Sequence, residues 1–544
     1  FYCHFCGVSF NIARSRKPGE PYSAEWGYSG APWGTGREEQ VDWTDCARHG
    51  CSLLVFAGFP QEDDAVHDPD YIPPEDDEYD PYEYDSDHES IDLLLHEEEQ
   101  KGSGIALDNE EQWYQDWLST FISQTDLPGE PIRVSDGSPE QDVIIPIHDN
   151  MPGTYDPEDL LHVPGPTCGK ANAYSGHGIS LEEMRGCRTA QCLIHNTIRG
   201  DWERDGLEQD WELSGEYFLS GLSDGMPSRD DGPRRVYPVR GGVARPEAEN
   251  ILFDPSRDPN EFALPFHPWC FDIFCRQSES HFGHVNTTGL MNWRKVECTF
   301  EDFHKFPRDA AVVAGQEQFW IHEPGQEYLV ANPLYVPNLV PLLRSAIKED
   351  GNFALSNGAF DIDQETKHHI ARSLEGPNDP LFSLSHDLRL SVLEYLGSHD
   401  IANLRLASRA FHQLPISLWH RLIREEMPWL WEAWDESENS DALSLWTSIT
   451  ANEMQVLCKT RKHYFSVLED ESQDTMLDGK IVDEMLSWPP AIPSQIKLPR
   501  AKTNWYEVYS GITRNWDQLK GLQNRKRIWK DVDEIIRRIQ MYEQ

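Results

Sequence analysis

Long apolar stretches and an N-terminal signal are both missing from this 544-residue chain. No run of 18 apolar residues occurs, so we expect no membrane span. The first residues, Phe1 to Cys6, have neither the basic start nor the apolar stretch of a signal peptide. They also include no initiating Met, which indicates a trimmed chain or a partial gene model. These features predict an intracellular location, cytoplasmic and/or nuclear.

Basic residues are scarce: 47 Lys and Arg stand against 94 Asp and Glu, giving a formal net charge of -47. Such an excess repels phosphate backbones, so we expect no nucleic-acid partner and no membrane partner. Residues 61–100 hold 18 of the acids and no Lys or Arg. A block of this kind cannot collapse against its own charge, and it predicts a disordered acidic linker.

Several catalytic signatures are also absent. The sequence has no phosphate-binding Gly-rich loop, no His-Glu-x-x-His and no paired-carboxylate motif. It has no internal repeat at propeller or leucine-rich periods. We therefore expect a protein that is not an enzyme.

Eleven cysteines are present, an odd number spread over a long chain, which favours reduced thiols over a disulfide framework. Cys3 and Cys6 form a Cys-x-x-Cys-Gly knuckle, a turn that suits zinc. The nearest further ligands are Cys46 and Cys51, with His49 as an alternative. The sequence predicts a structural zinc held by Cys3, Cys6, Cys46 and Cys51.

Two other cysteine groups leave alternatives open. Cys168, Cys187, Cys192 and His195 form either a loosely spaced metal set or buried small side chains. Cys270, with His267 and Cys275 nearby, is either the nucleophile of an enzyme in residues 167–345 or part of a buried aromatic helix. No nucleophile motif accompanies Cys270, so the buried helix is favoured.

Short amphipathic helices are indicated between Leu384 and Trp419. Leu388, Val392, Leu393 and Leu396 recur at three- and four-residue spacing and so share one helical face. Ser385 is expected to cap the first helix and Ser398 or Asp400 the second, which Pro415 is expected to end. Three helices in so few residues cannot close a core alone, and a partner surface is expected.

The same stretch resembles the F-box, the helical module that docks on the Skp adaptor of cullin-RING ubiquitin ligases. Ser385 stands where the family has proline, and Arg389 where it has an apolar residue. The remaining family positions are filled by Leu384, Asp387, Leu388, Val392, Leu393, Tyr395, Leu396, Asp400, Ile401, Leu404, Arg405, Ala407, Ser408, Arg409, Phe411, Leu418 and Trp419. Phrases before it, around 267–271 and 327–333, look similar to uncharacterised fungal F-box proteins with a Cys-containing N-terminal half.

The resemblance implies a substrate-recruiting subunit of a Skp–cullin–F-box ubiquitin ligase with an unknown protein substrate. The side chains expected to meet the adaptor are Leu384, Leu388, Val392, Leu393, Leu396, Ile401, Leu404 and Phe411. The alternative is a zinc-stabilised protein-interaction module whose F-box is degenerate or serves outside a ligase.

We predict an α+β fold: a mixed multi-domain chain with a three-helix F-box and a helical Trp-rich C-terminal part. Short strands are expected at 311–314, 319–321 and 328–331, and a helix at 337–347. The expected regions are 1–58 with the zinc site, 59–107 as acidic linker, 108–166 as a helix plus loops, 167–348 as a mixed domain, 349–379 as a polar linker, 380–425 as the F-box and 426–544 as the Trp-rich part.

Overall fold

A central strand, β6 (Thr189–His195), organises the largest part of the structure, a computed structural model. The structure describes residues 2–20, 24–26, 43–55, 143–147, 160–168, 173–198, 208–224, 263–316, 320, 322–349, 353, 360, 379–434, 445–451, 453–454 and 496–543. β7 (Tyr217–Leu219) and β9 (Ala263–Phe266) flank β6 antiparallel, and β8 (Ser223–Asp224) pairs with its first residues. All but the last residue of β6 are buried, as expected for a strand covered on both faces.

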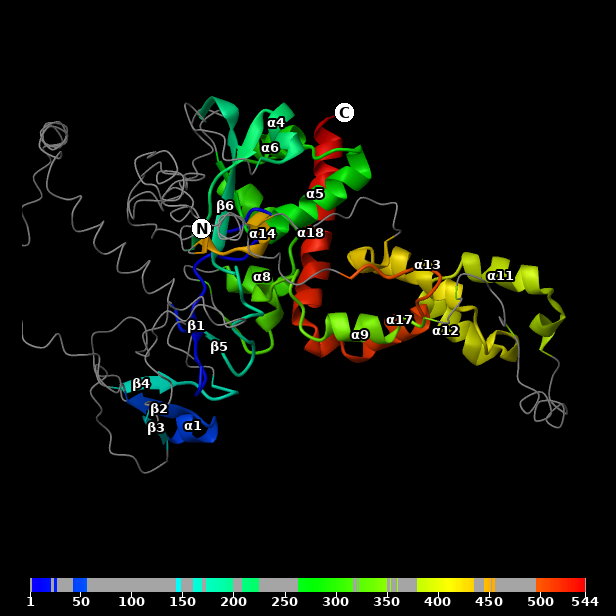
Figure 1. Ribbon diagram of the computed structural model, residues 1–544, viewed down its shortest axis with the longest axis horizontal. Coiled ribbons are helices and arrows are strands. Elements are labelled where there is room, and N and C mark those ends of the chain that lie inside the picture. The colour runs from blue at the N-terminus through cyan, green and yellow to red at the C-terminus, as the bar shows by residue number, and fades with distance from the viewer. Residues whose placement is uncertain are drawn as a thin grey trace, which may run out of the picture.

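Helices from distant parts of the chain cover this sheet, and together they form the body of the molecule. α5 (Pro268–Phe282) and α6 (Thr287–Val296) both pack against the long C-terminal helix α18 (Lys520–Tyr542) (Figure 1). α18 buries a stripe of apolar side chains at helical spacing, consisting of Ile528, Val532, Ile535, Ile536 and Ile539. Residues 3–12 enter the same core, so the body joins both ends of the chain.

Shorter elements complete the body. They are α4 (Asp210–Ser214), α7 (Phe300–Lys305), α8 (Ala310–Gly315), α14 (Leu445–Ser448), and the 3-10 turns η3 (Asn196–Ile198) and η6 (Glu327–Val330).

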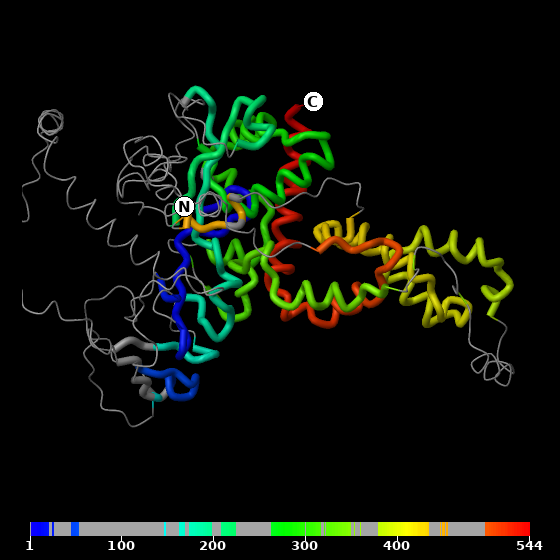
Figure 2. The backbone as a smooth tube through the Cα atoms, in the orientation of Figure 1, coloured from blue at the N-terminus to red at the C-terminus, as the bar shows by residue number. Residues whose placement is uncertain are grey.

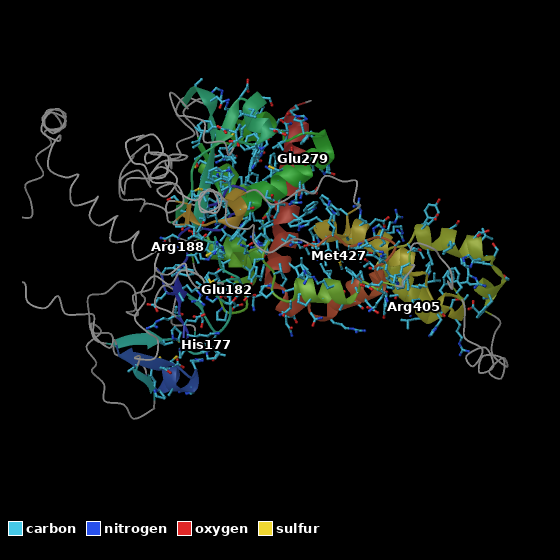
Figure 3. The ribbon with its side chains drawn as sticks, in the orientation of Figure 1. His177, Glu182, Arg188, Glu279, Arg405 and Met427 are labelled. Carbon is cyan, nitrogen blue, oxygen red and sulfur yellow. The ribbon has the colours of Figure 1, made fainter. Side chains whose placement is uncertain are left out.

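A second core connects the body to a projecting group of helices. It is formed by α9 (Leu339–Ser345), α17 (Trp505–Arg514), η9 (Trp431–Ala433), η10 (Trp516–Gln518) and α13 (Ile416–Glu426). Trp429 and Trp505 are buried in it. Figure 3 labels Met427, where α13 meets this core, and Arg405, on the projecting helices.

The projecting group, called here the three-helix unit, consists of α11 (His386–Glu394), α12 (Ser398–Ala407) and α13 (Figure 1). Two 3-10 turns, η7 (Pro380–Ser383) and η8 (Arg409–Phe411), accompany it. It has a small core of its own, built on Leu393, Ile401, Phe411, Leu418 and Leu422. Three helices therefore form where the sequence predicts them.

The joints of the three-helix unit differ in part from the prediction. Ser385 caps α11 as expected, accepting a hydrogen bond from the Leu388 amide. The N-cap of α12 is Gly397, so the prediction of Ser398 or Asp400 was wrong. Pro415 does not end α12, which stops at Ala407; it precedes α13 and caps its start, where its fixed φ suits a helix entry.

A small lobe lies at the other end of the molecule, reached by the N-terminal segment as it leaves the body (Figure 2). It contains α1 (Trp43–Arg48) and an antiparallel sheet in the order β3-β2-β4, with β2 (Ser52–Val55), β3 (Val143–Pro146) and β4 (Leu160–Val163). Between lobe and body, β1 (Arg14–Ser15) pairs in parallel with β5 (Tyr174–Ser175).

The α+β prediction is confirmed for the described residues, and the helix expected at 337–347 is α9. Two of the predicted strands were wrong, since 310–315 is helix α8 and 327–330 is a 3-10 turn. Of the strand predicted at 319–321 the structure describes only Trp320, which forms a bridge with Gln316. Both the acidic segment 61–100 and most of region 108–166 lie outside the described residues. Among the described helices, none combines the length and apolarity that crossing a bilayer requires.

Candidate metal centre

The N-terminal knuckle closes into a tight turn that directs two sulfurs into the body. The amide of Cys3 donates to the carbonyl of Val8 at 2.9 Å, and the amide of Gly7 donates to the carbonyl of Cys3 at 2.8 Å. Gly7 has φ +70°, and a Cβ there would lie 2.5 Å from Cδ of Arg308. Glycine is therefore required at this position both by the backbone conformation and by the close approach of Arg308.

The other two ligands come from the start of α5. His267 follows β9 and is the N-cap of the helix, with Pro268 in the first helical position. The amide of Cys270 donates to the carbonyl of His267 at 2.8 Å. This first turn places the imidazole of His267 and the sulfur of Cys270 on the same side.

Cys3, Cys6, His267 and Cys270 meet in the core, with one ligand atom of each within 4.8 Å of all the others. None is more than 1% exposed. The Sγ of Cys6 lies 3.5 Å from Nδ1 of His267, and the His267 amide donates to Sγ of Cys3 at 3.4 Å. The Nε2 of His267 lies 3.0 Å from the carbonyl of Cys187, a partner that leaves Nδ1 to face the sulfurs.

The donor set fits zinc. Three sulfurs and one imidazole nitrogen are a complete tetrahedral set for a structural Zn²⁺, with no position left for a substrate. Thiolates also disfavour Mg²⁺ and Ca²⁺, which prefer oxygen. The hydrogen bond between His267 and Cys187 is the outer contact that orients a metal-binding imidazole.

The pKa values of Cys6, His267 and Cys270 reflect their crowding. Burial opposes ionisation of Cys6, but hydrogen bonds with Cys270 and Cys3 hold its pKa well below the ordinary thiol value. Burial and hydrogen bonds to Cys3 and Cys6 raise the pKa of Cys270 well above that value. Burial opposes charge on His267, yet the Cys3 and Cys6 sulfurs raise its pKa to about 10. The sulfurs of the cluster therefore favour a positively charged group beside them.

Side chains from the body hold every carbonyl of the knuckle from His4 to Gly7. Arg308 donates to His4 O at 3.0 Å and to Phe5 O at 2.5 Å. Arg527 donates to Cys6 O at 2.8 Å, and Gln316 to Gly7 O at 2.6 Å. The knuckle is therefore fixed from outside by residues more than 300 positions away.

The charges of these side chains match a bound zinc. Zn²⁺ with three thiolates carries one net negative charge, and ionised Asp531 adds another. Arg308 and Arg527 balance both, lying 3.9 and 3.4 Å from the Asp531 carboxylate. Burial raises the pKa of Asp531 to about 7, and the two guanidiniums favour its ionised form. Buried charges need such pairing.

The predicted set of Cys3, Cys6, Cys46 and Cys51 needs correction, because the structure divides it. Cys3 and Cys6 join His267 and Cys270, whereas Cys46 and Cys51 lie with Cys168 in the small lobe. His49 is outside both sets, with its Nδ1 2.8 Å from Oγ1 of Thr167. Cys3 and Cys6 lie in the body, whereas Cys46 and Cys51 lie in the small lobe. Their proximity in sequence therefore does not bring the two pairs together in space.

The other predicted cysteine group is also divided. Cys187 and Cys192 are fully buried outside both clusters, and burial raises the pKa of the Cys187 thiol to about 12. They match the alternative of small buried side chains. His195 is half-exposed and lies 2.8 Å from the Thr197 hydroxyl through Nδ1.

Cys270 lies in the buried aromatic helix that the sequence favoured, with Trp269, Phe271, Ile273 and Phe274 around it. Its thiol is fully buried beside two other sulfurs, a setting for a metal ligand rather than an exposed nucleophile. Sequence reasoning missed His267 and Cys270 as ligands. The signal was their spacing, His-x-x-Cys, which repeats the spacing of Cys3 and Cys6.

The eight residues expected to meet an adaptor fall into two groups. Leu393, Ile401 and Phe411 are buried in the core of the three-helix unit. Leu384, Leu396 and Leu404 are half-buried, whereas Leu388 and Val392 are exposed, Leu388 by 54%. Only the second group has apolar surface available to a partner.

Comparison with known proteins gives little further identification. No family model matches the chain, and no solved structure matches it. A stretch of 56 residues is 68% identical to part of the "ATP-dependent RNA helicase mss116, mitochondrial" of Aspergillus oryzae. This stretch is 10% of the chain and spans 9% of that protein's length.

Proposed function

We propose that the protein is a substrate-recruiting subunit of a Skp–cullin–F-box ubiquitin ligase, and that the three-helix unit docks on the Skp adaptor. In this role the chain carries out no chemistry. It holds a protein substrate, of a kind that the sequence does not name, close to the ubiquitin-transfer machinery.

An exposed apolar stripe on α11 carries the proposal. Leu388, Val392 and Tyr395 follow each other at spacings of four and three residues, so they lie on one side of the helix. They are 54, 36 and 87% exposed, and Leu406 on α12 is also exposed. Exposed apolar side chains gathered on a projecting unit favour a protein partner. The position of the stripe within the F-box-like motif favours the Skp adaptor as that partner.

The candidate zinc centre in the core of the body is consistent with the proposal. A zinc bound by Cys3, Cys6, His267 and Cys270 would tie the N-terminal segment to α5 and, through Arg527, to α18. A structural metal of this kind contributes directly to folding. Its role would be to make the body that carries the three-helix unit rigid.

The test is a binding measurement between the full-length, zinc-loaded chain and a purified Skp adaptor. We expect a one-to-one complex. The double variant Leu388→Asp/Val392→Asp should weaken it at least about 100-fold, since each apolar side chain contributes roughly 1.5–3 kcal/mol when buried. Leu393 is unsuitable for this test, because it is buried and its replacement would unfold the unit.

The matched control is Leu213→Asp/Val313→Asp. These two side chains are 52 and 53% exposed on the body, so the control introduces the same charges at a distance from the three-helix unit. It should bind the adaptor like the wild type. Failure of the folded wild-type chain to bind, or equal loss in both variants, would refute docking through α11.

The alternative function is a zinc-stabilised interaction module whose F-box works outside a ligase. Ser385 and Arg389, the two departures from the F-box pattern, favour this alternative. Arg389 donates to the Phe382 carbonyl at 2.9 Å and lies over the Phe360 ring, and Ser385 caps α11. Capture of cullin together with the adaptor favours the ligase, and capture of the adaptor alone favours the alternative. The 56-residue similarity to a helicase is too short to support an RNA-unwinding activity for this chain.

A further inference from the structure

The small lobe has a second group of sulfurs. The Sγ atoms of Cys46, Cys51 and Cys168 lie within 4.8 Å of one another, and their residues are 0, 2 and 9% exposed. They come from the end of α1, the start of β2 and the turn after β4. None of the three forms a disulfide. Three buried thiols that converge from separate segments are typical of a metal site.

The backbone around these sulfurs is folded as a ligand-bearing turn. The amide of Cys51 donates to the carbonyl of Cys46 at 3.1 Å, and Gly50 between them has φ +70°. The amide of Cys168 donates to the carbonyl of Gly165 at 3.1 Å. The amide of Gly165 in turn donates to Sγ of Cys51 at 3.3 Å, a contact that stabilises a thiolate.

The two turns are held against each other independently of the sulfurs. A Cβ on Gly165 would lie 1.9 Å from the carbonyl oxygen of His49, so only glycine permits this approach. The imidazole of His49 reaches across, with Nδ1 2.8 Å from Oγ1 of Thr167 and Nε2 3.5 Å from the Asp45 carboxylate. His49 thus positions the turns.

Cysteines form much of the described core of the small lobe. Among the side chains whose burial is described, its cluster consists of Cys46, Cys51, Leu53, Ile147 and Cys168, and three of these five are the cysteines themselves. Small units are commonly held together by a staple such as a metal or a disulfide. Reduced thiols with an amide directed at one of them fit a metal better than a disulfide.

We propose that Cys46, Cys51 and Cys168 bind a second zinc ion, which holds the small lobe together. Among the described residues this site has three ligands, of which Cys168 is 9% exposed. The second zinc should therefore be released more readily than the first, whose four ligands are complete and more deeply buried. This site is separate from adaptor docking and stands if the proposed function fails.

Counting metal in the full-length protein tests the proposal. Elemental analysis and native mass spectrometry should find two zinc ions in the wild type and one in Cys168→Ala. Cys192→Ala is the matched control, since Cys192 is a fully buried cysteine outside both clusters, and it should keep two. With Co²⁺ in place of zinc, Cys168→Ala should lose about half of the thiolate-to-metal charge-transfer absorbance.

A second measurement needs no variant, in case Cys168→Ala does not fold. A chelator added to the wild type should remove zinc in two phases, the faster coinciding with increased amide exchange in residues 43–55 and 160–168. One zinc in the wild type, or two in folded Cys168→Ala, would overturn the proposal. So would a disulfide between two of these cysteines in metal-free native protein.

Discussion

At the scale of single residues, the knuckle of Cys3 and Cys6 is held in place by side chains that lie far from it in sequence. Arg527 shows this most clearly. Its guanidinium donates to the carbonyl of Cys6, to Asn524 at 2.7 Å and to Asp531 at 3.4 Å, and it is buried. One side chain of α18 thus satisfies both the backbone of the zinc knuckle and a buried carboxylate.

Replacing Arg527 by Met should lower the free energy of unfolding by about 3–5 kcal/mol, because it leaves a buried carbonyl and a buried charge without their partner. Arg537→Met is the control on the same helix. Arg537 is 61% exposed in its pair with Glu534, and such exposed pairs contribute at most about 1 kcal/mol. Urea denaturation measures both, and equal effects would contradict the buried role of Arg527.

Zinc affinity at the first centre should depend steeply on pH. Without metal, Cys270 holds its proton because its pKa is raised, and His267 is protonated because its pKa is raised to about 10. Zinc must displace both protons, so affinity rises with pH near neutrality. Proton release by calorimetry in buffers of different ionisation enthalpy measures this, and affinity independent of pH would contradict the ligand assignment.

At the scale of elements, side chains of α13 cap both other helices of the three-helix unit. Arg421 donates to the carbonyls of Leu393 and Leu396 at the C-terminal end of α11, at 2.8 and 3.0 Å. Glu426 accepts from the amide of Ser398 at 2.7 Å at the start of α12. A cation at a helix C-terminus and an anion at an N-terminus both act favourably on the helix dipole.

Arg421→Met should therefore loosen the end of α11, at a cost of about 1–3 kcal/mol from the lost charged hydrogen bonds. Hydrogen exchange of the α11 amides should accelerate, while exchange in β6 and α18 stays unchanged. Arg409→Met, which removes an exposed arginine from the same unit, is the control. Unchanged exchange in α11 with Arg421→Met would show that the cap is not needed.

Elements and ligands that depend on local contacts could be predicted from the sequence, whereas those that depend on distant contacts could not. The helices of the three-helix unit and α9 have strong periodicity, and Ser385 is a local cap, so they could be predicted. The strands expected at 311–314 and 328–331 were wrong, because short apolar runs occur equally in buried helical turns. Of the zinc ligands, Cys3 and Cys6 could be found by spacing. Their partners His267 and Cys270 are over 250 residues away, and only tertiary packing brings them close.

At the scale of the whole molecule, the N-terminal segment and the C-terminal helix α18 meet at the candidate metal centre. Residues 3–12, β9, α5 and α18 share a core around it, while the three-helix unit is attached through a second core of α9, α13 and α17. The acidic excess of the chain is not evenly spread, since α18 carries several basic residues, of which Arg527 contacts the knuckle. The body and the docking surface are therefore stabilised by different contacts.

Removal of zinc should affect these two parts differently. Chelation should increase amide exchange in residues 2–12, β9 and α5, because the metal would hold these segments together. Exchange in α11 and α12, whose core contains none of the ligands, should change far less. Uniform acceleration across the chain would show that the zinc centre and the three-helix unit form one cooperative unit.

Co-elution of the zinc-loaded full-length chain with purified Skp adaptor and cullin is the most direct test of the proposed docking. We predict one peak containing all three proteins in equal amounts, lost with Leu388→Asp/Val392→Asp and kept with Leu213→Asp/Val313→Asp. A folded, zinc-loaded chain that elutes apart from the adaptor would contradict the proposed function.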